Sequence, residues 1–452
     1  MKPKVLLADD DVDNLAALSQ RLERQFLVVA AGLPDPVRIA LEHWREQEDL
    51  RLAIIDLRLP GGEDGRAAED HGLDLIAKLK QHRPRSRVAA RSAYDSHENL
   101  ARAVAVGADA FLSKRRPDDI LESAHFLHVW ATAGAAFAGL ARGLDVRHPD
   151  LAGHGDRVRE LSRALLCHLP RADPKNFDLA ACMLAAELHD LGKLAVPDEV
   201  LAGTGAGASP EARQMLERHV EFAALLRDLG PGFDKVARIV HLHHRCYAEP
   251  RSRTVSDYPA DAGLPRGDDI PFETRVLRAA DVLDTLLTRR TALDLDAALA
   301  TIRQETELGV FDPRVTAALE HLASTDRALL QRLYTPTDAG DRAELAVYFT
   351  DRRVTAGCLL TFLESLTRIY LPSGRLADRL TVSGVEVGRF EGGATVKVRL
   401  AGNRDDVRRA QEALQHRIQA AAPPVGALSQ TMSQQGAPPV PHHVERLDST
   451  GG

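Results

Sequence analysis

The chain has 452 residues, more than one ordinary domain holds, so its length predicts two to four domains. Hydrophobic residues make up 44% of the chain and charged residues 27%, which excludes an intrinsically disordered protein. The net charge of −7 argues against a surface that binds nucleic-acid polymers as the main output.

Short apolar runs alternate with helical patterns over residues 1–122. Buried strands are predicted at Val5–Ala8 and Leu52–Ile55, and weaker ones at Val88–Ala90 and Ala110–Leu112. Strands that alternate with helices predict an α/β domain with a parallel sheet covered on both faces. In such sheets, functional groups gather at the carboxyl ends of the strands.

Polar residues stand at the carboxyl ends of these strands. Asp9 and Asp10 follow the first strand, Asp56 the second, Ser92 the third and Lys114 the fourth. Three carboxylates in one pocket favour a hard cation such as Mg²⁺, which prefers oxygen ligands. The cation would let Asp56 attack a phosphoryl group, and Ser92 and Lys114 could then hold the phosphate oxygens.

This arrangement resembles the receiver domain of two-component response regulators. The resemblance covers residues 1–122 and implies a doubly wound domain with a five-stranded parallel sheet. It also implies Asp56 as phospho-acceptor, Asp9, Asp10 and Asp56 as magnesium ligands, Ser92 and Lys114 as switch residues, and a sensor histidine kinase as partner. Two departures are Arg91, at a place that is usually apolar, and Arg115, which stands in place of the usual proline after Lys114.

A long helix, or two in tandem, is predicted from Pro117 to Arg142, and we assign residues 123–146 to a linker helix. Residues 123–141 contain no Asp, Glu, Lys or Arg. The stretch is long enough to span a bilayer, but its Ala, Gly, His, Ser and Thr content favours a buried interdomain or homodimer helix. The first residues do not resemble a signal peptide, and the four scattered cysteines are typical of reduced thiols, so we expect a cytoplasmic protein.

The region from Asp150 to Leu333 is almost purely helical in pattern. Histidines and aspartates recur on its apolar helices, at Asp150, His154, His189, Asp190, His219, His243, His244 and Asp281. Ligands from several apolar helices point into one bundle core, where a metal compensates the buried acids. Mixed imidazole and carboxylate ligands suit Fe, Mn or Zn better than Ca. Such a centre activates water for attack on phosphorus, and Lys193 is placed to hold a phosphate.

The segment His189-Asp190-Leu191-Gly192-Lys193, together with His243-His244, Tyr258-Pro259 and Ala280–Asp284, resembles the HD superfamily and within it the HD-GYP domain. The resemblance implies an all-α phosphohydrolase domain at residues 147–335 that hydrolyses cyclic di-GMP or a related cyclic dinucleotide. It implies two or three transition-metal ions, Fe or Mn, held by Asp150, His154, His189, Asp190, His219, His243, His244 and Asp281. It further implies His189, Asp190 and Lys193 as catalytic residues, and Lys193, Tyr258 and Arg290 as substrate-binding residues. The departures are Asp257 in place of the signature glycine and Thr291-Ala292-Leu293 after Arg290.

Residues 340–420 are predicted to form a small α+β domain of unknown role, with strands at Ala346–Phe349, Leu380–Val387 and Ala394–Leu400. Helices are expected near Leu359–Ile369 and from Asp405. Pro, Gly, Ser and Gln dominate residues 421–452, which predicts a disordered tail.

These patterns together favour a response regulator whose phosphorylation controls a metal-dependent cyclic-dinucleotide phosphodiesterase. Two alternatives stay open at this stage. One is a signalling module with weak or no catalysis that binds nucleotide or partner proteins, and the other is an HD hydrolase for another phosphoester. The complete set of metal ligands favours catalysis, whereas the altered Asp257-Tyr258-Pro259 segment favours the alternatives.

Overall fold

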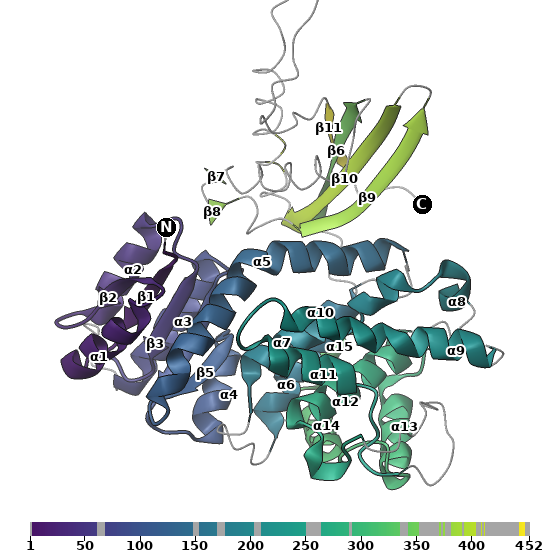
Figure 1. The fold of residues 1–452 in the computed structure, drawn as a ribbon, viewed down its shortest axis with the longest axis horizontal. Helices are drawn as coiled ribbons and strands as arrows, with labels where there is room; N and C mark the ends of the chain where they lie inside the picture. The colour runs from purple at the N-terminus through teal and green to yellow at the C-terminus, as the bar shows by residue number, and fades with distance from the viewer. Residues whose placement is uncertain are drawn as a thin grey trace, which may run out of the picture. The chain divides into compact units, whose positions relative to one another are not determined.

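A computed structural model describes residues 2–60, 68–147, 153–169, 177–202, 209–249, 264–288, 292–334, 342–351, 370–371, 374–375, 381–390, 393–403, 408, 411 and 443–447. The chain divides into two compact units, Met1–Tyr334 and Thr335–Gly452. The first unit holds an α/β domain and a helical domain, and the second holds a small sheet (Figure 1).

The α/β domain is built on a five-stranded parallel sheet in the order β2-β1-β3-β4-β5. The strands are β1 (Lys4–Ala8), β2 (Leu27–Ala31), β3 (Leu52–Asp56), β4 (Arg87–Ser92) and β5 (Ala110–Ser113). All four pairings are parallel, and the register sets Asp56 beside Arg91 and Ser92 beside Ser113. The doubly wound sheet expected from the sequence is confirmed.

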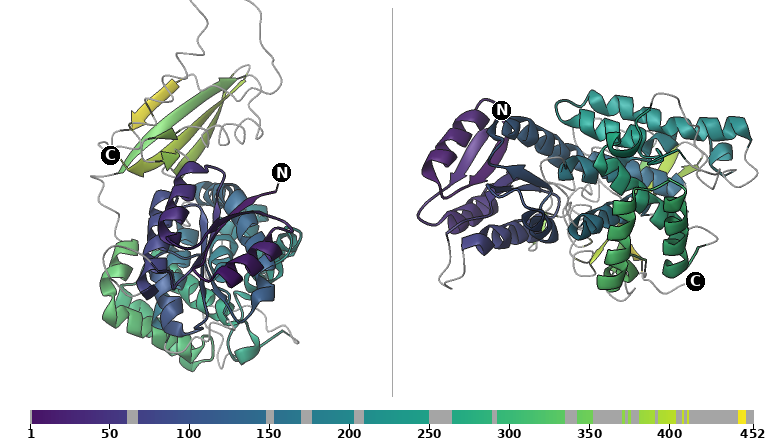
Figure 2. Two further views of the ribbon diagram at one scale, coloured as in Figure 1. Left: turned by 90° about the vertical axis from the view of Figure 1, so that its left-hand side faces the viewer. Right: turned by 90° about the horizontal axis from the view of Figure 1, so that it is seen from below.

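Helices cover both faces of this sheet (Figure 2). They are α1 (Val12–Leu22), α2 (Pro36–Glu46), α3 (Ala68–His82), α4 (His97–Ala105) and α5 (Ile120–Arg147). Successive strand residues point to opposite faces, so Leu7 and Ile54 pack with α1 and α5, while Leu6 and Ile55 pack with α2 and α3. Because both faces are covered, the strands β1, β3 and β4 are buried along most of their length.

Helix α5 follows a short 3₁₀ turn, η1 (Pro117–Asp119), and confirms the long helix predicted over this stretch. Its first half joins the two domains of the unit. Phe126 of α5 packs edge-on against Phe233, with ring centroids 4.9 Å apart, and the Arg87 guanidinium lies 3.6 Å from the centroid of the Trp130 ring. Among the described helices, none has both the length and the apolar character needed to cross a membrane.

The helical domain has no strand among its described residues. Its helices and 3₁₀ turns are α6 (His154–His168), α7 (Leu179–Leu188), η4 (Leu191–Ala195), α8 (Asp198–Ala202), α9 (Pro210–Glu217), η5 (Arg218–Phe222), α10 (Ala223–Arg227), α11 (Phe233–Leu242), η6 (Gly267–Asp269), α12 (Phe272–Thr288), α13 (Leu295–Glu307), α14 (Pro313–Thr325) and α15 (Arg327–Tyr334). Every residue of α7 except Glu187 is buried.

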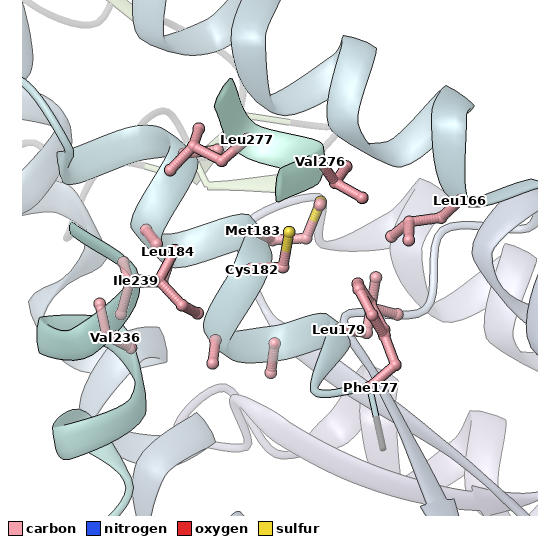
Figure 3. Packing of buried hydrophobic residues seen from close by; sticks show 14 of the residues in the cluster. Leu166, Phe177, Leu179, Cys182, Met183, Leu184, Val236, Ile239, Val276 and Leu277 are labelled. Carbon is pink, nitrogen blue, oxygen red and sulfur yellow. The ribbon is translucent and has the colours of Figure 1, made fainter. Parts of the chain in front are cut away.

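Helix α7 is therefore the central helix of this domain, and apolar side chains surround it. Figure 3 shows Cys182, Met183 and Leu184 among side chains from α11 and α12, such as Ile239 and Val276. Asp178 caps the helix, because its side chain accepts a hydrogen bond from the backbone N of Ala181. A central helix that is apolar on all sides leaves polar groups only at its ends, and His189 lies at its carboxyl end.

The second unit contains a four-stranded antiparallel sheet in the order β11-β6-β10-β9. Its strands are β6 (Arg342–Asp351), β9 (Thr381–Phe390), β10 (Gly393–Asn403) and β11 (His443–Leu447), and β7 (Tyr370–Leu371) pairs with β8 (Gly374–Arg375). The three predicted strands are present, whereas the helix expected at Leu359–Ile369 lies outside the described residues. Strand β11 lies in the segment for which we predicted disorder; those five residues pair with β6, and the composition of the segment did not indicate this.

Candidate functional site

The acidic residues of the α/β domain meet at the carboxyl edge of its sheet, as predicted. Ligand atoms of Asp9, Asp10 and Asp56 lie within 4.8 Å of one another, close enough to share a cation. Lys114, from the turn after β5, places its Nζ 2.6 Å from Oδ2 of Asp56 and 3.0 Å from Oδ2 of Asp9. Asp9 and Asp56 are both buried. The pocket thus combines three carboxylates with a lysine ammonium.

The carboxyl group of Asp56 is buried beside Lys114. Burial raises the pKa of its carboxyl, and the hydrogen bond and charge of Lys114 offset part of that rise. Ser92 lies at the end of β4 and is buried, with its Oγ accepting a hydrogen bond from the backbone N of Tyr94 at 3.0 Å. Arg91, whose side chain is 3% exposed, contacts Asp9 Oδ2 through NH1 at 3.3 Å.

A second cluster lies in the helical domain, where histidines and aspartates from five elements converge. Three groups each bring their ligand atoms within 4.8 Å of one another: His154, His189 and Asp281; His189, Asp190 and His243; and His219, His243 and His244. Because the groups share His189 and His243, they form one continuous cluster. The ligands come from the start of α6, the end of α7, η5, the end of α11 and the middle of α12.

Distances within the cluster are those of side chains arranged around shared cations. Nε2 of His154 lies 3.2 Å from Nε2 of His189 and 3.2 Å from Oδ1 of Asp281. Nε2 of His219 lies 3.2 Å from Nε2 of His244 and 3.6 Å from Oδ1 of Asp190. Ring nitrogens that face one another at such distances are typical of residues that ligate the same metal.

In three of the histidines, the ring nitrogen Nδ1 faces away from the cluster. Its hydrogen bond determines which nitrogen of the ring can bind a metal. Nδ1 donates a hydrogen bond to the backbone carbonyl three residues earlier in His189 (to Ala186, 2.9 Å), His219 (to Leu216, 2.6 Å) and His243 (to Val240, 2.6 Å). A carbonyl oxygen only accepts, so Nδ1 must carry the proton and a neutral ring presents the Nε2 lone pair to the cluster. Local helix ends therefore orient three ligands in the same way.

Charges in the cluster put its members in the protonation states that metals require. Burial alone would raise the pKa of Asp190, but the charges of Lys193, His189 and His154 hold it well below its usual range. Burial lowers the pKa of His219 to about 4. Burial, with the nearby imidazoles, also puts the pKa values of His243 and His244 well below the usual value. Ionised carboxylates and neutral imidazoles are the ligand forms.

His154 differs, because carboxylates surround it. Burial by itself would lower its pKa, but hydrogen bonds to Asp281 and Asp284 and the charges of Asp281 and Asp190 raise it to about 10. Such an imidazole would carry a proton on both ring nitrogens, whereas the neutral rings of His219, His243 and His244 each carry only one. A cation placed among the same carboxylates would take over the role of that proton.

Two buried polar atoms facing the cluster test whether it suits a metal. Nε2 of His243 and Oδ1 of Asp190 have no hydrogen-bond partner within the described part of the chain. Buried polar atoms without partners are costly, and most have an explanation such as a bound ion. The residues present therefore fit a metal centre, and imidazole with carboxylate favours a transition metal.

A glycine permits the close approach of two segments that carry ligands. Gly192 lies in η4, directly after Asp190 and Leu191, and a Cβ at this position would collide with the backbone carbonyl of His219. Only glycine lets the turn after α7 lie against η5. This contact brings Asp190 and His219 to one cluster.

Lys193 lies at the edge of the cluster rather than apart from it. Its Nζ is 2.5 Å from Oδ2 of Asp190, and its side chain is partly buried. The lysine is thus held beside a candidate ligand by a charge-assisted hydrogen bond.

Asp284 lies one helical turn after Asp281 and has no role predicted from the sequence. Its carboxylate is fully buried and accepts hydrogen bonds from His154 Nδ1, Arg157 and the hydroxyl of Tyr334. The spacing of three residues within an apolar helix was a signal that both carboxylates lie on one face of α12. Its partners, however, come from distant parts of the chain.

Three predicted site residues, Asp150, Tyr258 and Arg290, lie outside the described residues. Helix α11 ends at Leu242, so His243 is its C-cap and His244 follows in a turn. The turn changes the direction of the chain and lets two adjacent histidines face the same cluster.

Comparison with known proteins gives two domain matches. Residues 5–125 match the response regulator receiver domain, and residues 140–315 match the HD domain. The chain therefore contains a receiver domain and an HD domain. These matches agree with the two clusters, since the acidic pocket lies in the receiver domain and the histidine cluster in the HD domain.

Three relatives resemble different shares of the chain. A cyclic di-GMP phosphodiesterase of Thermotoga maritima is 24% identical over 63% of this chain and 80% of its own length. The response regulator RpfG of Xanthomonas campestris, a cyclic di-GMP phosphodiesterase, is 38% identical over 30% of this chain and 34% of its length. A 3'3'-cGAMP-specific phosphodiesterase of Vibrio cholerae is 29% identical over 39% of this chain and 36% of its length.

Proposed function

We propose that this chain is a response regulator in which phosphorylation of Asp56 controls a metal-dependent phosphodiesterase that hydrolyses a cyclic dinucleotide. The observation that carries the proposal is the histidine and aspartate cluster of the HD domain. Its neutral imidazoles, ionised carboxylates and unpartnered buried atoms suit a centre of two or three transition-metal ions, Fe or Mn. The relatives named for phosphodiesterase activity support the substrate class.

The chemistry needs water to attack one phosphorus atom of the cyclic substrate while the ester P–O bond breaks, which leaves a linear dinucleotide. Bound metal ions would supply an activated water and would neutralise phosphate oxygens. The ligands assigned to this role are His154, His189, Asp190, His219, His243, His244 and Asp281, with Asp150 as an eighth. Asp190 and His189 orient the centre from the end of α7, and Lys193 offers its ammonium to the substrate phosphate. Tyr258 and Arg290 complete the proposed substrate contacts.

The receiver domain supplies the control. A sensor histidine kinase would donate its phosphoryl group to Asp56: the carboxylate oxygen bonds to phosphorus while the P–N bond of the kinase's phosphohistidine breaks and its imidazole leaves. We assign Mg²⁺ binding to Asp9, Asp10 and Asp56, because hard cations prefer carboxylate oxygens. Lys114 already contacts the Asp56 carboxylate and can hold a phosphate oxygen by charge. We assign Ser92, at the end of the neighbouring strand β4, as a switch residue whose hydroxyl holds a phosphate oxygen.

Contacts between the domains offer a route for that control. Arg163 of α6 donates from NH1 to the backbone carbonyls of Val104 and Ala108, each at 3.3 Å, at the carboxyl end of receiver helix α4. Helix α6 begins at His154, one of the proposed metal ligands. A shift of α4 would therefore act directly on a helix that carries the metal centre.

The deciding experiment measures metal content first and turnover second. Protein purified without oxygen and supplied with Fe or Mn should hold at least two ions per chain and hydrolyse cyclic di-GMP or 3'3'-cGAMP. Asp190→Ala and His189→Ala should each lose metal and turnover, because the remaining ligands no longer surround the cations. His241→Ala is the matched control, since this exposed histidine lies on α11 two residues before His243.

Each outcome has a distinct meaning. Less than one ion per chain under metal-replete conditions contradicts the catalytic proposal and leaves a binding module. Full metal content without turnover of either cyclic dinucleotide, but with hydrolysis of another phosphoester, contradicts the substrate class alone.

Helix α5 supports a second part of the proposal, a cytoplasmic homodimer. Residues 123–141 lack charged side chains, and Leu140 in the second half of the helix is 48% exposed. The stretch without charged residues is the basis for this part of the proposal, in which a second copy would cover Leu140. Light scattering at micromolar protein concentration should give the mass of a dimer, and a strict monomer with and without phosphorylation contradicts this part.

A further inference from the structure

An arginine lies against the acidic pocket of the receiver domain. Arg91 is the penultimate residue of β4 and is paired in register with Asp56. Its side chain is almost fully buried, and NH1 contacts Oδ2 of Asp9 at 3.3 Å. Because a guanidinium stays charged in proteins, the pocket holds a permanent positive charge in addition to that of Lys114.

The oxygen that Arg91 contacts is already shared by other donors. Oδ2 of Asp9 also accepts from Lys114 Nζ at 3.0 Å and from the side-chain amide of Asn14. The other oxygen, Oδ1, accepts from the backbone N of Asp11 at 3.0 Å. A cation that uses Asp9 as a ligand therefore competes with Arg91 for the same carboxylate.

Charge repulsion acts in the same direction. A guanidinium next to Asp9 also lies next to any divalent cation bound there, and two positive charges at such short range repel each other. We propose that Arg91 is a built-in counter-ion of the acidic pocket, which competes with Mg²⁺ for Asp9 and raises the Mg²⁺ concentration needed for phosphorylation of Asp56. This inference rests on the magnesium site proposed above.

The structure also has room for the displaced side chain. Arg91 lines a cavity of about 490 Å³ between the receiver and HD domains, whose other walls include Phe126 of α5 and Ile239 of α11. The cavity carries acidic groups from both sides, among them Glu122 and Glu273. A guanidinium that leaves Asp9 can therefore turn toward carboxylates at the domain interface.

The test compares Mg²⁺ binding by the full chain and its variants. Calorimetry gives the Mg²⁺ dissociation constant. Binding that is present in the wild-type chain and lost in Asp9→Asn is assigned to the receiver site. Arg91→Met keeps a long side chain without the charge and should lower that constant by roughly tenfold, equivalent to about 1.4 kcal/mol. The Mg²⁺ concentration for half-maximal labelling of Asp56 by acetyl phosphate should fall by a similar factor.

Arg91→Lys keeps the charge, so its Mg²⁺ dissociation constant should stay much closer to the wild-type value than that of Arg91→Met. Arg38→Met is the charge control, because it removes one exposed arginine from α2 in the same domain. It should leave the Mg²⁺ dissociation constant unchanged. If Arg91→Met does not fold, Arg91→Gln removes the same charge with a polar side chain.

The two possible failures are distinguishable. An unchanged or higher Mg²⁺ dissociation constant in Arg91→Met, while the wild-type chain shows Asp9-dependent binding, overturns the counter-ion role alone. Absence of any Asp9-dependent Mg²⁺ binding in both proteins overturns the magnesium site and this inference with it.

Discussion

Nδ1 of His154 lies 2.8 Å from Oδ2 of Asp284, a carboxylate with no exposed surface. Two other groups hold the same carboxylate: Arg157 donates from Nε at 2.6 Å, and the Tyr334 hydroxyl donates to Oδ1 at 3.0 Å. The imidazole ring is thereby fixed with Nε2 directed at His189 and Asp281. A carboxylate that orients a histidine in this way raises the basicity of the ligand and limits its motion.

Asp284→Asn should therefore weaken metal binding without removing a ligand. The amide lacks the negative charge and can place an NH₂ group against Arg157, so the orientation of His154 is lost. Loss of such a supporting carboxylate typically costs about 10- to 100-fold in metal affinity. Competition with a chelator measures this affinity directly.

Tyr334→Phe serves as the graded control, because it removes one hydrogen bond from the same carboxylate and leaves the charge. It should lower metal affinity by less than Asp284→Asn does, by roughly fivefold or less, equivalent to about 1 kcal/mol. Equal metal affinity in Asp284→Asn and the wild-type chain contradicts the positioning role.

The contrast between Asp281 and Asp284 shows what the sequence could supply. Both stand in one apolar helix, and resemblance to a known motif pointed to Asp281 as a ligand. The role of Asp284 depends on Arg157 and Tyr334, which lie 127 and 50 residues away in the chain. Contacts over such separations follow from helix packing, which local patterns do not determine.

The receiver domain shows the same limit. Short apolar runs located four strands, and strand ends located the acidic pocket, because a parallel sheet brings these ends together. Arg91 was visible only as an unusual residue at its position. Arg91 lies in β4 and Asp9 follows β1, and β3 lies between these two strands. The contact between Arg91 and Asp9 can therefore be predicted only when the order of the strands in the sheet is known.

Asp56→Asn should abolish labelling by a small-molecule phosphodonor in the presence of Mg²⁺. The carboxylate beside Lys114 is the proposed nucleophile, and an amide cannot form the acyl phosphate. Phosphate-affinity gel electrophoresis measures the labelled fraction. Asp95→Asn is the matched control, since Asp95 is bound to Ser113 near the same edge of the sheet. Wild-type labelling of Asp56→Asn contradicts the assignment.

Lys193→Ala should keep the metal ions and weaken substrate binding. The lysine contacts Asp190 but supplies no ligand atom, so its loss removes a charge-assisted contact to phosphate worth about 1.5–3 kcal/mol. The Michaelis constant should rise while metal content stays at the wild-type value. Lys193→Arg keeps the charge and should recover part of the loss. Metal loss in Lys193→Ala would instead assign the residue to holding Asp190.

Arg163→Met should uncouple the two domains while leaving each site intact. Its guanidinium bonds to the carbonyls of Val104 and Ala108, at the end of receiver helix α4, from a position nine residues after His154 on α6. Methionine keeps the apolar packing of the stem but offers no donor to these carbonyls. Phosphorylation of Asp56 should then change the rate of cyclic-dinucleotide hydrolysis by a smaller factor than in the wild-type chain.

Turnover assays with and without acetyl phosphate measure that factor, and the labelled fraction of Asp56 confirms equal phosphorylation. Arg303→Met, which removes an exposed arginine paired with Glu320, should keep the full response. An undiminished response in Arg163→Met would show that the signal passes through other contacts, such as those of α5.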